Sequence, residues 1–147
     1  MSHTFKGGVH PNYMKAPEVP VTVIAPPSQV VIPMIQHIGA PCQPLVKVGD
    51  YVKMPPLTEE QLKDPEAILE RIREAGVVGM GGAMFPTAVK IRGGIGKVDK
   101  LIINGAECEP YLNGDHLTML NFPEQLLKGI ELVRIASCVD KAYYGIE

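Results

Sequence analysis

The sequence lacks the charge pattern of a nucleic-acid-binding or membrane-surface protein. Its 147 residues carry a formal net charge of -2 with a pI near 6.1, and lysine and arginine are scattered rather than clustered. A basic patch or stripe is the electrostatic feature that nucleic acid and anionic membranes require. We therefore expect no nucleic-acid partner.

Cysteine is also scarce. Cys42, Cys108 and Cys138 are odd in number, lie far apart and form no C-x-x-C pair. This spacing argues against a disulfide framework and against a self-contained zinc site, and it indicates a reducing, cytoplasmic compartment. Three cysteines are also too few to hold a four-cysteine iron–sulfur cluster.

Long apolar runs are missing, although 46% of the residues are hydrophobic and suffice for a core. The first eight residues have no apolar region of the signal-peptide type, and Pro26, Pro27 and Pro33 interrupt the longest apolar stretches. A transmembrane helix needs about 20 apolar residues in succession. We therefore expect no direct membrane insertion, and any membrane association to depend on a partner.

Proline is distributed unevenly, because ten of the fourteen prolines lie between positions 11 and 56. We predict two units, a Pro-rich β unit over residues 1–56 and an α/β unit over residues 57–147. In the first, residues 19–25 and 45–52 are short and β-branched, which is typical of strands. A tight turn at Gly49 and Asp50 is expected within a hairpin.

The pattern becomes helical from Thr58. Thr58 and Gln61 match a capping box, and Asp64 followed by Pro65 is typical of an N-cap and first helical residue. We predict a helix to about residue 75, with Gly76 as its C-terminal cap. Its apolar positions follow the 3.6-residue period at Ile68, Leu69, Ile72 and Ala75.

The remaining elements alternate between strand and helix. Residues 100–106 and 141–147 are typical of buried strands, Pro123 is expected to open a helix that runs to residue 136, and Asp115 is a candidate cap for another. This order predicts a Rossmann-like parallel α/β sheet with helical crossovers. Because the sequence ends in what should be a central strand, we expect an incomplete sheet and a fragment of a longer protein.

A glycine-rich stretch, GVVGMGGAMFPTAVK at residues 76–90, follows the first predicted helix and is expected to lead into a strand. Glycines without Cβ atoms allow backbone N–H groups to approach an anion or a planar ring, so the stretch is interpreted as a nucleotide cradle. It is not the Rossmann fingerprint, since Met84 stands where the third glycine is needed, nor a Walker loop, since Val98 follows Gly96 and Lys97. A flexible loop without a functional role is the alternative.

A second stretch, LIINGAECEPY at residues 101–111, places polar residues after an apolar strand. Ligands of open α/β sheets bind at the carboxyl ends of strands. Asn104 both donates and accepts hydrogen bonds, while Glu107 and Glu109 suit sugar hydroxyls or a ring N–H. An ordinary acidic loop is the alternative.

Two other chemistries involve the same residues. Glu107, Glu109, Cys108 and His116 would be the ligands of a metal site, and Cys108 with His116 would be a nucleophile pair. The regular ligand spacings of metal sites are absent, and nothing marks an activating environment or an oxyanion hole. We predict neither a metal site nor a catalytic side chain, and a small apolar packing role for Cys108 is the alternative.

Three sequence blocks, FKGGVHP near the start, GVVGMGGAMFPTAVK and LIINGAECEPYL, resemble the RnfC family, whose members are subunits of the Rnf complex. This complex is the membrane-associated, ion-translocating ferredoxin:NAD oxidoreductase of bacteria. The latter two blocks are also similar to the NADH-binding flavoprotein subunit of respiratory complex I. A related clostridial electron-transfer protein linked to proline reduction shares the blocks and is an alternative.

The resemblance implies FMN and NAD(H) as cofactors. By analogy, the glycine loop approaches flavin and dinucleotide, Lys90 neutralises phosphate, and Asn104 and Glu107 contact flavin and nicotinamide nucleotide. Phe85 would pack near the nucleotide, with a role in the core as the alternative. The predicted cofactor-binding residues are Gly79, Gly81, Gly82, Ala83, Phe85, Lys90, Asn104, Glu107 and Glu109.

The sequence departs from these families at several positions. Met80, Ala106 and Gly93 stand where complex I has an arginine, an acidic residue and an aromatic residue. The stretch VKVGDYV resembles the start of a lipoyl-like barrel-sandwich, yet Met54 runs directly into two prolines. Either a segment is missing there or the β unit is abbreviated.

The resemblance implies a function in electron transport. Electrons would pass between NAD(H) and iron–sulfur carriers through FMN, with the clusters in a C-terminal region that this sequence lacks. Partners would be the other subunits of a membrane-bound, ion-translocating complex, with the chain peripheral on the cytoplasmic side of the bacterial membrane. Because the chain is expected to be a fragment, enzyme activity of its own stays open. A non-catalytic docking fragment of such a complex is the alternative.

Overall fold

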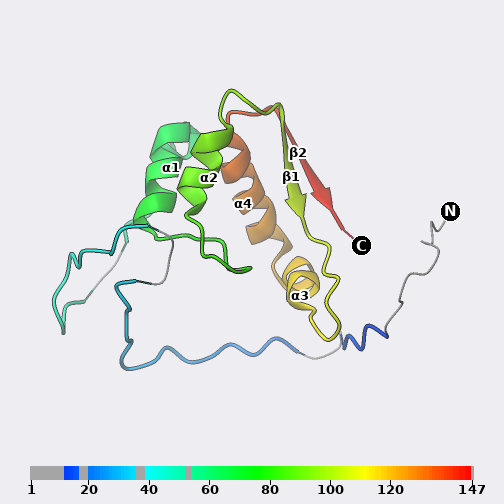
Figure 1. Cartoon of the computed structure of the whole chain (residues 1–147), viewed down its shortest axis with the longest axis horizontal. Coiled ribbons are helices and arrows are strands. Elements are labelled where there is room, and N and C mark those ends of the chain that lie inside the picture. Colours follow the sequence, from blue (N-terminus) through cyan, green and yellow to red (C-terminus); the bar gives the residue numbers. More distant parts are fainter. Residues whose placement is uncertain (1–11, 17–19, 36–38, 52–53, 147) are drawn as a thin grey trace.

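The computed structural model of the chain describes residues 12–16, 20–35, 39–51 and 54–146. In Figure 1 the helices α1, α2 and α4 gather in one body, and a sheet of β1 and β2 lies beside α4. The predicted mixed α/β class is therefore confirmed. In chain order the elements are η1 (Gln61–Lys63), α1 (Pro65–Glu74), α2 (Thr87–Gly94), β1 (Lys100–Asn104), α3 (Gly114–Asn121), α4 (Pro123–Ala136) and β2 (Lys141–Gly145).

The N-terminal β unit differs from the prediction. No strand forms in the described residues before residue 55, so the strands expected over residues 20–25 and 45–51 are wrong there. The predicted turn is present, because the Asp50 N–H donates to the Lys47 carbonyl at 3.1 Å and Gly49 has a φ of +96°. A hairpin alone is marginal in water, and strands need a further partner or a packed face to persist. Positions 19 and 52 and the FKGGVHP block lie outside the described residues.

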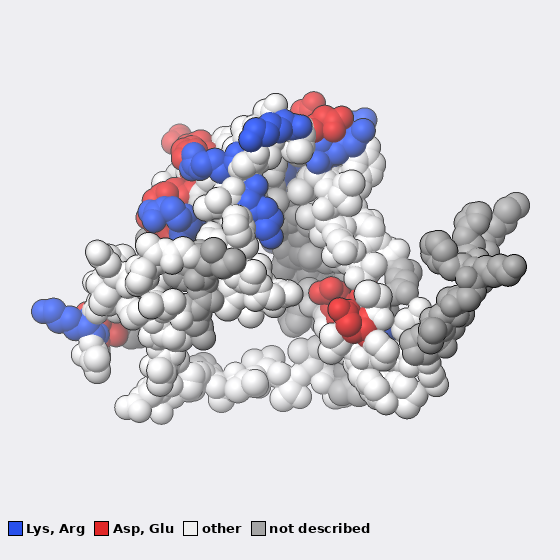
Figure 2. Space-filling model, viewed as in Figure 1, with Lys and Arg blue, Asp and Glu red and all other residues white. Residues whose placement is uncertain are grey.

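The segment from Pro20 to Val46 contains no Asp, Glu, Lys or Arg. In Figure 2 the part of this segment over residues 20–35 forms a white strip along the lower edge, whereas most charged side chains lie over the helices. Large apolar side chains of the segment are exposed at Val21, Val23, Ile24, Val30, Val31, Ile32, Met34, Ile35, Leu45 and Val46. An extended, uncharged and apolar segment of this kind is typical of chain that pairs with a partner surface.

Local capping explains where α1 begins and ends. Thr58 and Gln61 exchange the two hydrogen bonds of a capping box ahead of η1. At the start of α1 itself, the Asp64 carboxylate accepts from the Glu66 N–H at 3.0 Å. At the other end Gly76 has a φ of +65°, and the N–H groups of residues 76 and 77 donate back to Arg73 and Ile72. This is a Schellman motif, so the predicted helix and both of its caps are confirmed.

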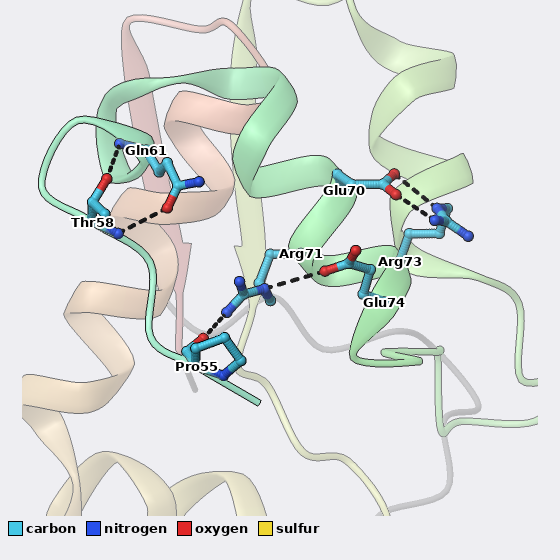
Figure 3. A network of polar contacts seen from close by, with 7 residues as sticks. All are labelled: Pro55, Thr58, Gln61, Glu70, Arg71, Arg73 and Glu74. Atoms are coloured by element: carbon cyan, nitrogen blue, oxygen red, sulfur yellow. Dashed lines mark hydrogen bonds and ion pairs between the residues drawn. The ribbon is translucent and has the colours of Figure 1, made fainter. Parts of the chain in front are cut away.

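Polar contacts join the surface of α1 to the preceding segment (Figure 3). Arg71 donates to the Pro55 carbonyl and forms an ion pair with Glu74 at 3.5 Å. Arg73 donates through Nε and Nη2 to the two oxygens of the Glu70 carboxylate, and this hydrogen bonding holds the pKa of Glu70 below its usual value. Because both side chains are open to solvent, the pair of Glu70 and Arg73 adds little stability.

The core lies between α1, α2 and α4. Ile68 and Leu69 of α1 pack with Ile91 of α2 and Ala136 of α4, and all four are buried. The sequence did not predict α2, because Pro86 provides no side-chain cap and two of its eight residues are glycines. Packing of Ile91 against α1 stabilises this helix instead, in keeping with the tertiary origin of most helix stability.

The sheet has the predicted parallel topology. Strands β1 and β2 pair in register from Lys100 with Lys141 to Asn104 with Gly145, and α3 and α4 form the connection between them. One further bond, from the Gly105 N–H to the Gly145 carbonyl at 2.8 Å, extends the ladder beyond β1. Residue 104 therefore lies at the carboxyl end of a parallel strand, as expected for a ligand-binding edge.

Candidate functional site

The glycine-rich loop, residues 79–85, is closed at its base. The Gly79 N–H donates to the Phe85 carbonyl at 2.9 Å, and the Thr87 N–H donates to the Val77 carbonyl at 3.0 Å. The loop connects α1 to α2, so the expectation that it leads from a helix into a strand is wrong. Packing of α1 on α2 holds the two ends of the loop together, and this gives the loop a fixed base.

The tip of the loop is free of the protein's own side chains. A Cβ atom at Gly81 or at Gly82 would meet no atom within 4 Å, and Gly82 has a φ of +156°. Met80 beside them is 87% exposed. At the base, the Lys90 ammonium lies 3.5 Å from the position that a Gly79 Cβ would occupy. The loop thus combines bare backbone with a neighbouring cation, which is a suitable surface for a phosphate-bearing ligand.

The end of β1 contrasts with the loop, because its glycine is covered from within the protein. A Cβ atom at Gly105 would lie 2.6 Å from the Tyr144 hydroxyl oxygen and 2.7 Å from two ring carbons. Asn104 forms a local turn, in which its Oδ1 accepts from the Ala106 N–H at 3.1 Å. Asn104 is exposed, and its side-chain amide N–H groups donate to no acceptor in the described part of the chain.

Glu107 has a structural role that the sequence did not indicate. Its two carboxylate oxygens lie 3.3 and 3.2 Å from the Asp115 backbone nitrogen and accept its N–H, in the first turn of α3. Asn113 at the N-cap position forms no side-chain cap, and Asp115, the predicted cap, lies within the helix. A carboxylate at a helix N-terminus is favoured by the exposed N–H groups and by the helix dipole.

Replacing Glu107 by alanine is expected to lower the free energy of unfolding by about 1 kcal/mol, because α3 loses its capping acceptor. Urea denaturation followed by circular dichroism measures this loss. Glu109→Ala is the matched control, since Glu109 is exposed and, among the described residues, its carboxylate contacts only the Cys108 thiol, at 3.9 Å. Equal stability of the two variants would contradict the capping role.

The segment after β1 is also held by residues far away in the sequence. Lys15 in the N-terminal part of the chain is half-buried, and its ammonium lies 5.6 Å from the centre of the Tyr13 ring. Sequence reasoning missed both residues, because nothing local marks a contact across 92 positions. Three hydrogen bonds form the connection, from the Tyr111 N–H to the Tyr13 carbonyl at 2.8 Å, from Asn113 Nδ2 to the Ala16 carbonyl at 3.0 Å and from Lys15 Nζ to the Glu107 carbonyl.

The structure does not join the two halves of the predicted site directly. In the described residues no hydrogen bond or ion pair connects the glycine loop to residues 104–109. A cavity of about 390 Å³ beside the base of the loop is lined mainly by apolar residues, among them Leu69, Val77 and Met84. None of the nine predicted cofactor-binding residues lines this cavity, so the cradle and the cavity are different surfaces.

Metal and nucleophile chemistry find no support in the described part of the chain. Within it, no group of three or more His, Cys, Asp or Glu side chains is placed to hold a metal ion. All three cysteines are exposed, so the alternative that Cys108 packs as a small apolar residue is wrong. No contact links Cys108 to His116 in this part of the protein.

Comparison with known protein families identifies both parts of the chain. Residues 72–147 match the family described as the Nuo51 FMN-binding domain, and residues 3–62 match the RnfC barrel sandwich hybrid domain. The chain belongs to the RnfC family. The glycine loop and the end of β1 both lie in the part that matches the FMN-binding domain.

Curated RnfC relatives match nearly the whole chain. The RnfC protein of the Na(+)-translocating ferredoxin:NAD(+) oxidoreductase complex from Acetobacterium woodii is 34% identical over 98% of this chain and 45% of its own length. The RnfC protein of an ion-translocating oxidoreductase complex from Klebsiella pneumoniae is 33% identical over 97% of this chain and 26% of its own length. The chain therefore spans less than half the length of these relatives.

The alignments with these RnfC relatives are longer than the chain itself. The A. woodii alignment runs over 201 residues, against 147 residues in this chain. The relative therefore contains internal sequence with no counterpart here, in keeping with the expected missing or abbreviated segment. A missing half of the barrel-sandwich would also explain why the described residues before residue 55 form no strand.

A solved structure shares the fold of this RnfC-family chain. The crystal structure of an NAD+-reducing [NiFe]-hydrogenase in its air-oxidized state superposes with a TM-score of 0.52 and 37% sequence identity. The match covers 57% of this chain and 15% of the hydrogenase chain. Among the described residues, no helix has the length and apolar character needed to cross a membrane.

Proposed function

We propose that this chain is the FMN- and NAD(H)-binding part of an electron-transfer subunit that passes electrons between NAD(H) and iron–sulfur carriers. The observation that carries the proposal is the open tip of the glycine loop. Gly81 and Gly82 carry no side chains, yet no protein atom needs that space. Bare backbone that the protein itself leaves uncovered is the expected surface for a flat or phosphate-bearing ligand.

The residues of the chain fit the two cofactors in separate ways. The Lys90 ammonium at the base of the loop supplies positive charge for phosphate. The exposed Asn104 amide and the Glu109 carboxylate at the end of β1 supply hydrogen-bonding groups for a nucleotide. When bound, FMN takes up a hydride from nicotinamide and releases electrons singly. The protein contributes binding, orientation and charge.

The same proposal assigns partners and location. The relatives named above are subunits of ion-translocating complexes, so we place this chain among such subunits, on the cytoplasmic side of a bacterial membrane. Its three exposed cysteines are too few for a four-cysteine cluster. Iron–sulfur carriers would therefore belong to sequence or subunits other than these 147 residues.

A glycine substitution tests the cradle directly. Gly81→Val is expected to weaken FMN binding at least tenfold, because the new side chain would occupy the space that the ligand needs. It should leave folding intact, since no protein atom lies within 4 Å of that Cβ position and Gly81 does not have a positive φ. Quenching of FMN fluorescence gives the affinity, and thermal denaturation gives the stability.

Gly93→Val is the matched control, because a Cβ at Gly93 also meets nothing within 4 Å and the residue lies at the opposite end of α2. This variant should bind FMN as the wild-type chain does. FMN affinity that is the same in both variants, or a wild-type chain that does not bind FMN, would overturn the proposed cradle.

Docking within a membrane complex is a second candidate function, and the uncharged segment from Pro20 to Val46 favours it. Its exposed apolar side chains suit contact with another polypeptide. A chain that assembles with its complex but never binds flavin would support docking alone.

A further inference from the structure

The loop between β1 and α3 carries Glu107 and Glu109, but few local contacts fix its conformation. Within the loop, the Asn104 turn and a bond from the Leu112 N–H to the Glu109 carbonyl at 3.3 Å are local. Glu107 adds the contact to α3. At the start of the loop, the Gly105 N–H donates to the Gly145 carbonyl of β2. The contacts with the N-terminal part of the chain come from residues 12–16, which we name the N-terminal clasp.

The N-terminal clasp forms three hydrogen bonds with the loop. Lys15 donates to the Glu107 carbonyl, the Tyr111 N–H donates to the Tyr13 carbonyl, and the Asn113 side-chain amide donates to the Ala16 carbonyl. Figure 1 shows this short dark-blue segment beside the connection that leads to α3. The Tyr13 ring beneath the Lys15 ammonium favours the side-chain direction that reaches Glu107.

Strained backbone on both sides of the contact indicates that the surroundings fix the conformation of the clasp and of the loop. Met14 in the clasp has a φ of +51°, and Tyr111 in the loop has a φ of +68°. Non-glycine residues adopt this left-handed conformation at a cost, and they keep it only where the surroundings fix it. Here the hydrogen bond between residues 13 and 111 lies directly beside both strained residues.

We propose that the N-terminal clasp positions the β1–α3 loop for cofactor binding, with Lys15 as the main positioning residue. This inference rests on the proposed function, because it assumes that the loop contacts FMN or NAD(H). Without the clasp the loop populates open conformations, and the apparent dissociation constant rises in inverse proportion to the closed fraction. The clasp thus joins the N-terminal part of the chain to the FMN-binding part.

Two variants of the full chain test the clasp. Lys15→Met keeps the aliphatic stem but removes the donor to the Glu107 carbonyl. Asn113→Asp removes the donor to the Ala16 carbonyl, and it leaves a residue well suited to the N-cap position of α3. Each is expected to speed amide hydrogen exchange at Tyr111 about tenfold and to weaken FMN binding by a similar factor, as the loss of one hydrogen bond predicts.

Lys15→Arg should restore much of both properties, because arginine can also donate to the carbonyl. Lys47→Met is the control, since this exposed lysine forms hydrogen bonds only through its backbone in the described residues. Unchanged exchange at Tyr111 in both variants would overturn the clasp. Faster exchange with unchanged FMN affinity would overturn its positioning role.

The two readouts separate this inference from the proposed function. If the wild-type chain fails to quench FMN fluorescence, the proposed function fails and positioning for a cofactor fails with it. The exchange rate at Tyr111 then still decides whether the clasp holds the loop. If the wild-type chain binds FMN and the variants bind equally well, only the clasp is wrong.

Discussion

Replacing Ile68 by alanine is expected to lower the free energy of unfolding by about 3 kcal/mol. Ile68 is 2% exposed and lies in the middle of the cluster formed with Leu69, Ile91 and Ala136. Loss of its three outer carbons removes contacts to α2 and α4 and leaves a cavity. Urea denaturation and the midpoint of thermal unfolding both measure the effect.

This loss is large relative to the stability that such a core supports. In the described residues only six apolar side chains are buried, at Ile68, Leu69, Ala88, Ile91, Ala136 and Val139. A core of this size suggests a total stability near the lower end of the usual range, about 5 kcal/mol. The Ile68→Ala chain should therefore retain only about 2 kcal/mol, so that a small fraction of the molecules, a few per cent, is unfolded at equilibrium.

Val89→Ala on the exposed side of α2 is the control, because its side chain is 56% exposed and should cost less than about 0.5 kcal/mol. Ile68→Val should lie between the two, at about 1 kcal/mol. A result in which Ile68→Ala and Val89→Ala unfold together would mean that the cluster between the helices is not the core.

The same cluster explains how the core supports the candidate site. Residue 68 lies on α1, which leads into the glycine loop, and Ile91 lies on α2, which follows the loop. Packing of these two helices holds the base of the loop closed, so Ile68→Ala should also weaken FMN binding. The closed base of the loop therefore depends on the packing of α1 on α2, whereas this packing does not depend on the open tip of the loop.

Elements with local signals could be predicted from the sequence. The capping box marks the turn before η1, Asp64 with Pro65 and Gly76 define α1, and Pro123 defines the start of α4. The strands β1 and β2 follow from short apolar stretches, and their parallel pairing follows from the helices between them. In each case the information lies within a few residues of the boundary.

Elements that depend on distant partners could not be predicted in this way. Helix α2 has no cap and ends in two glycines, and its stability comes from packing on α1. The predicted N-terminal strands have β-branched sequences but no pairing partner in the described residues. Contacts such as Lys15 with Glu107 leave no trace in either local sequence.

Function-related glycines illustrate the same limit. The sequence shows which residues lack side chains, but only the structure shows what occupies the vacated space. At Gly81 and Gly82 no protein atom occupies it, which leaves room for a ligand. At Gly105 the ring of Tyr144 occupies it, so one glycine of the predicted binding edge has an internal explanation.

Gly105→Ala is therefore expected to destabilise the protein by about 2 kcal/mol, the usual cost of forcing extra atoms into a packed site. The new methyl group would lie 2.6–2.7 Å from the Tyr144 ring, closer than real contacts allow. Either the ring leaves its half-buried place on β2, or the bond from the Gly105 N–H to the Gly145 carbonyl lengthens. Both changes loosen the carboxyl end of the parallel pair.

A double-mutant cycle isolates the cause. Tyr144→Ala loses its own packing, but Gly105→Ala should cost little in that background because the clash is gone, which gives a coupling of about 1–2 kcal/mol, as for other contacting pairs. Gly129→Ala in α4 is the control, because a Cβ there meets nothing within 4 Å and alanine favours the helix. If the losses in the free energy of unfolding at residues 105 and 144 are strictly additive, then the place of the Tyr144 ring is not the reason for a glycine at residue 105.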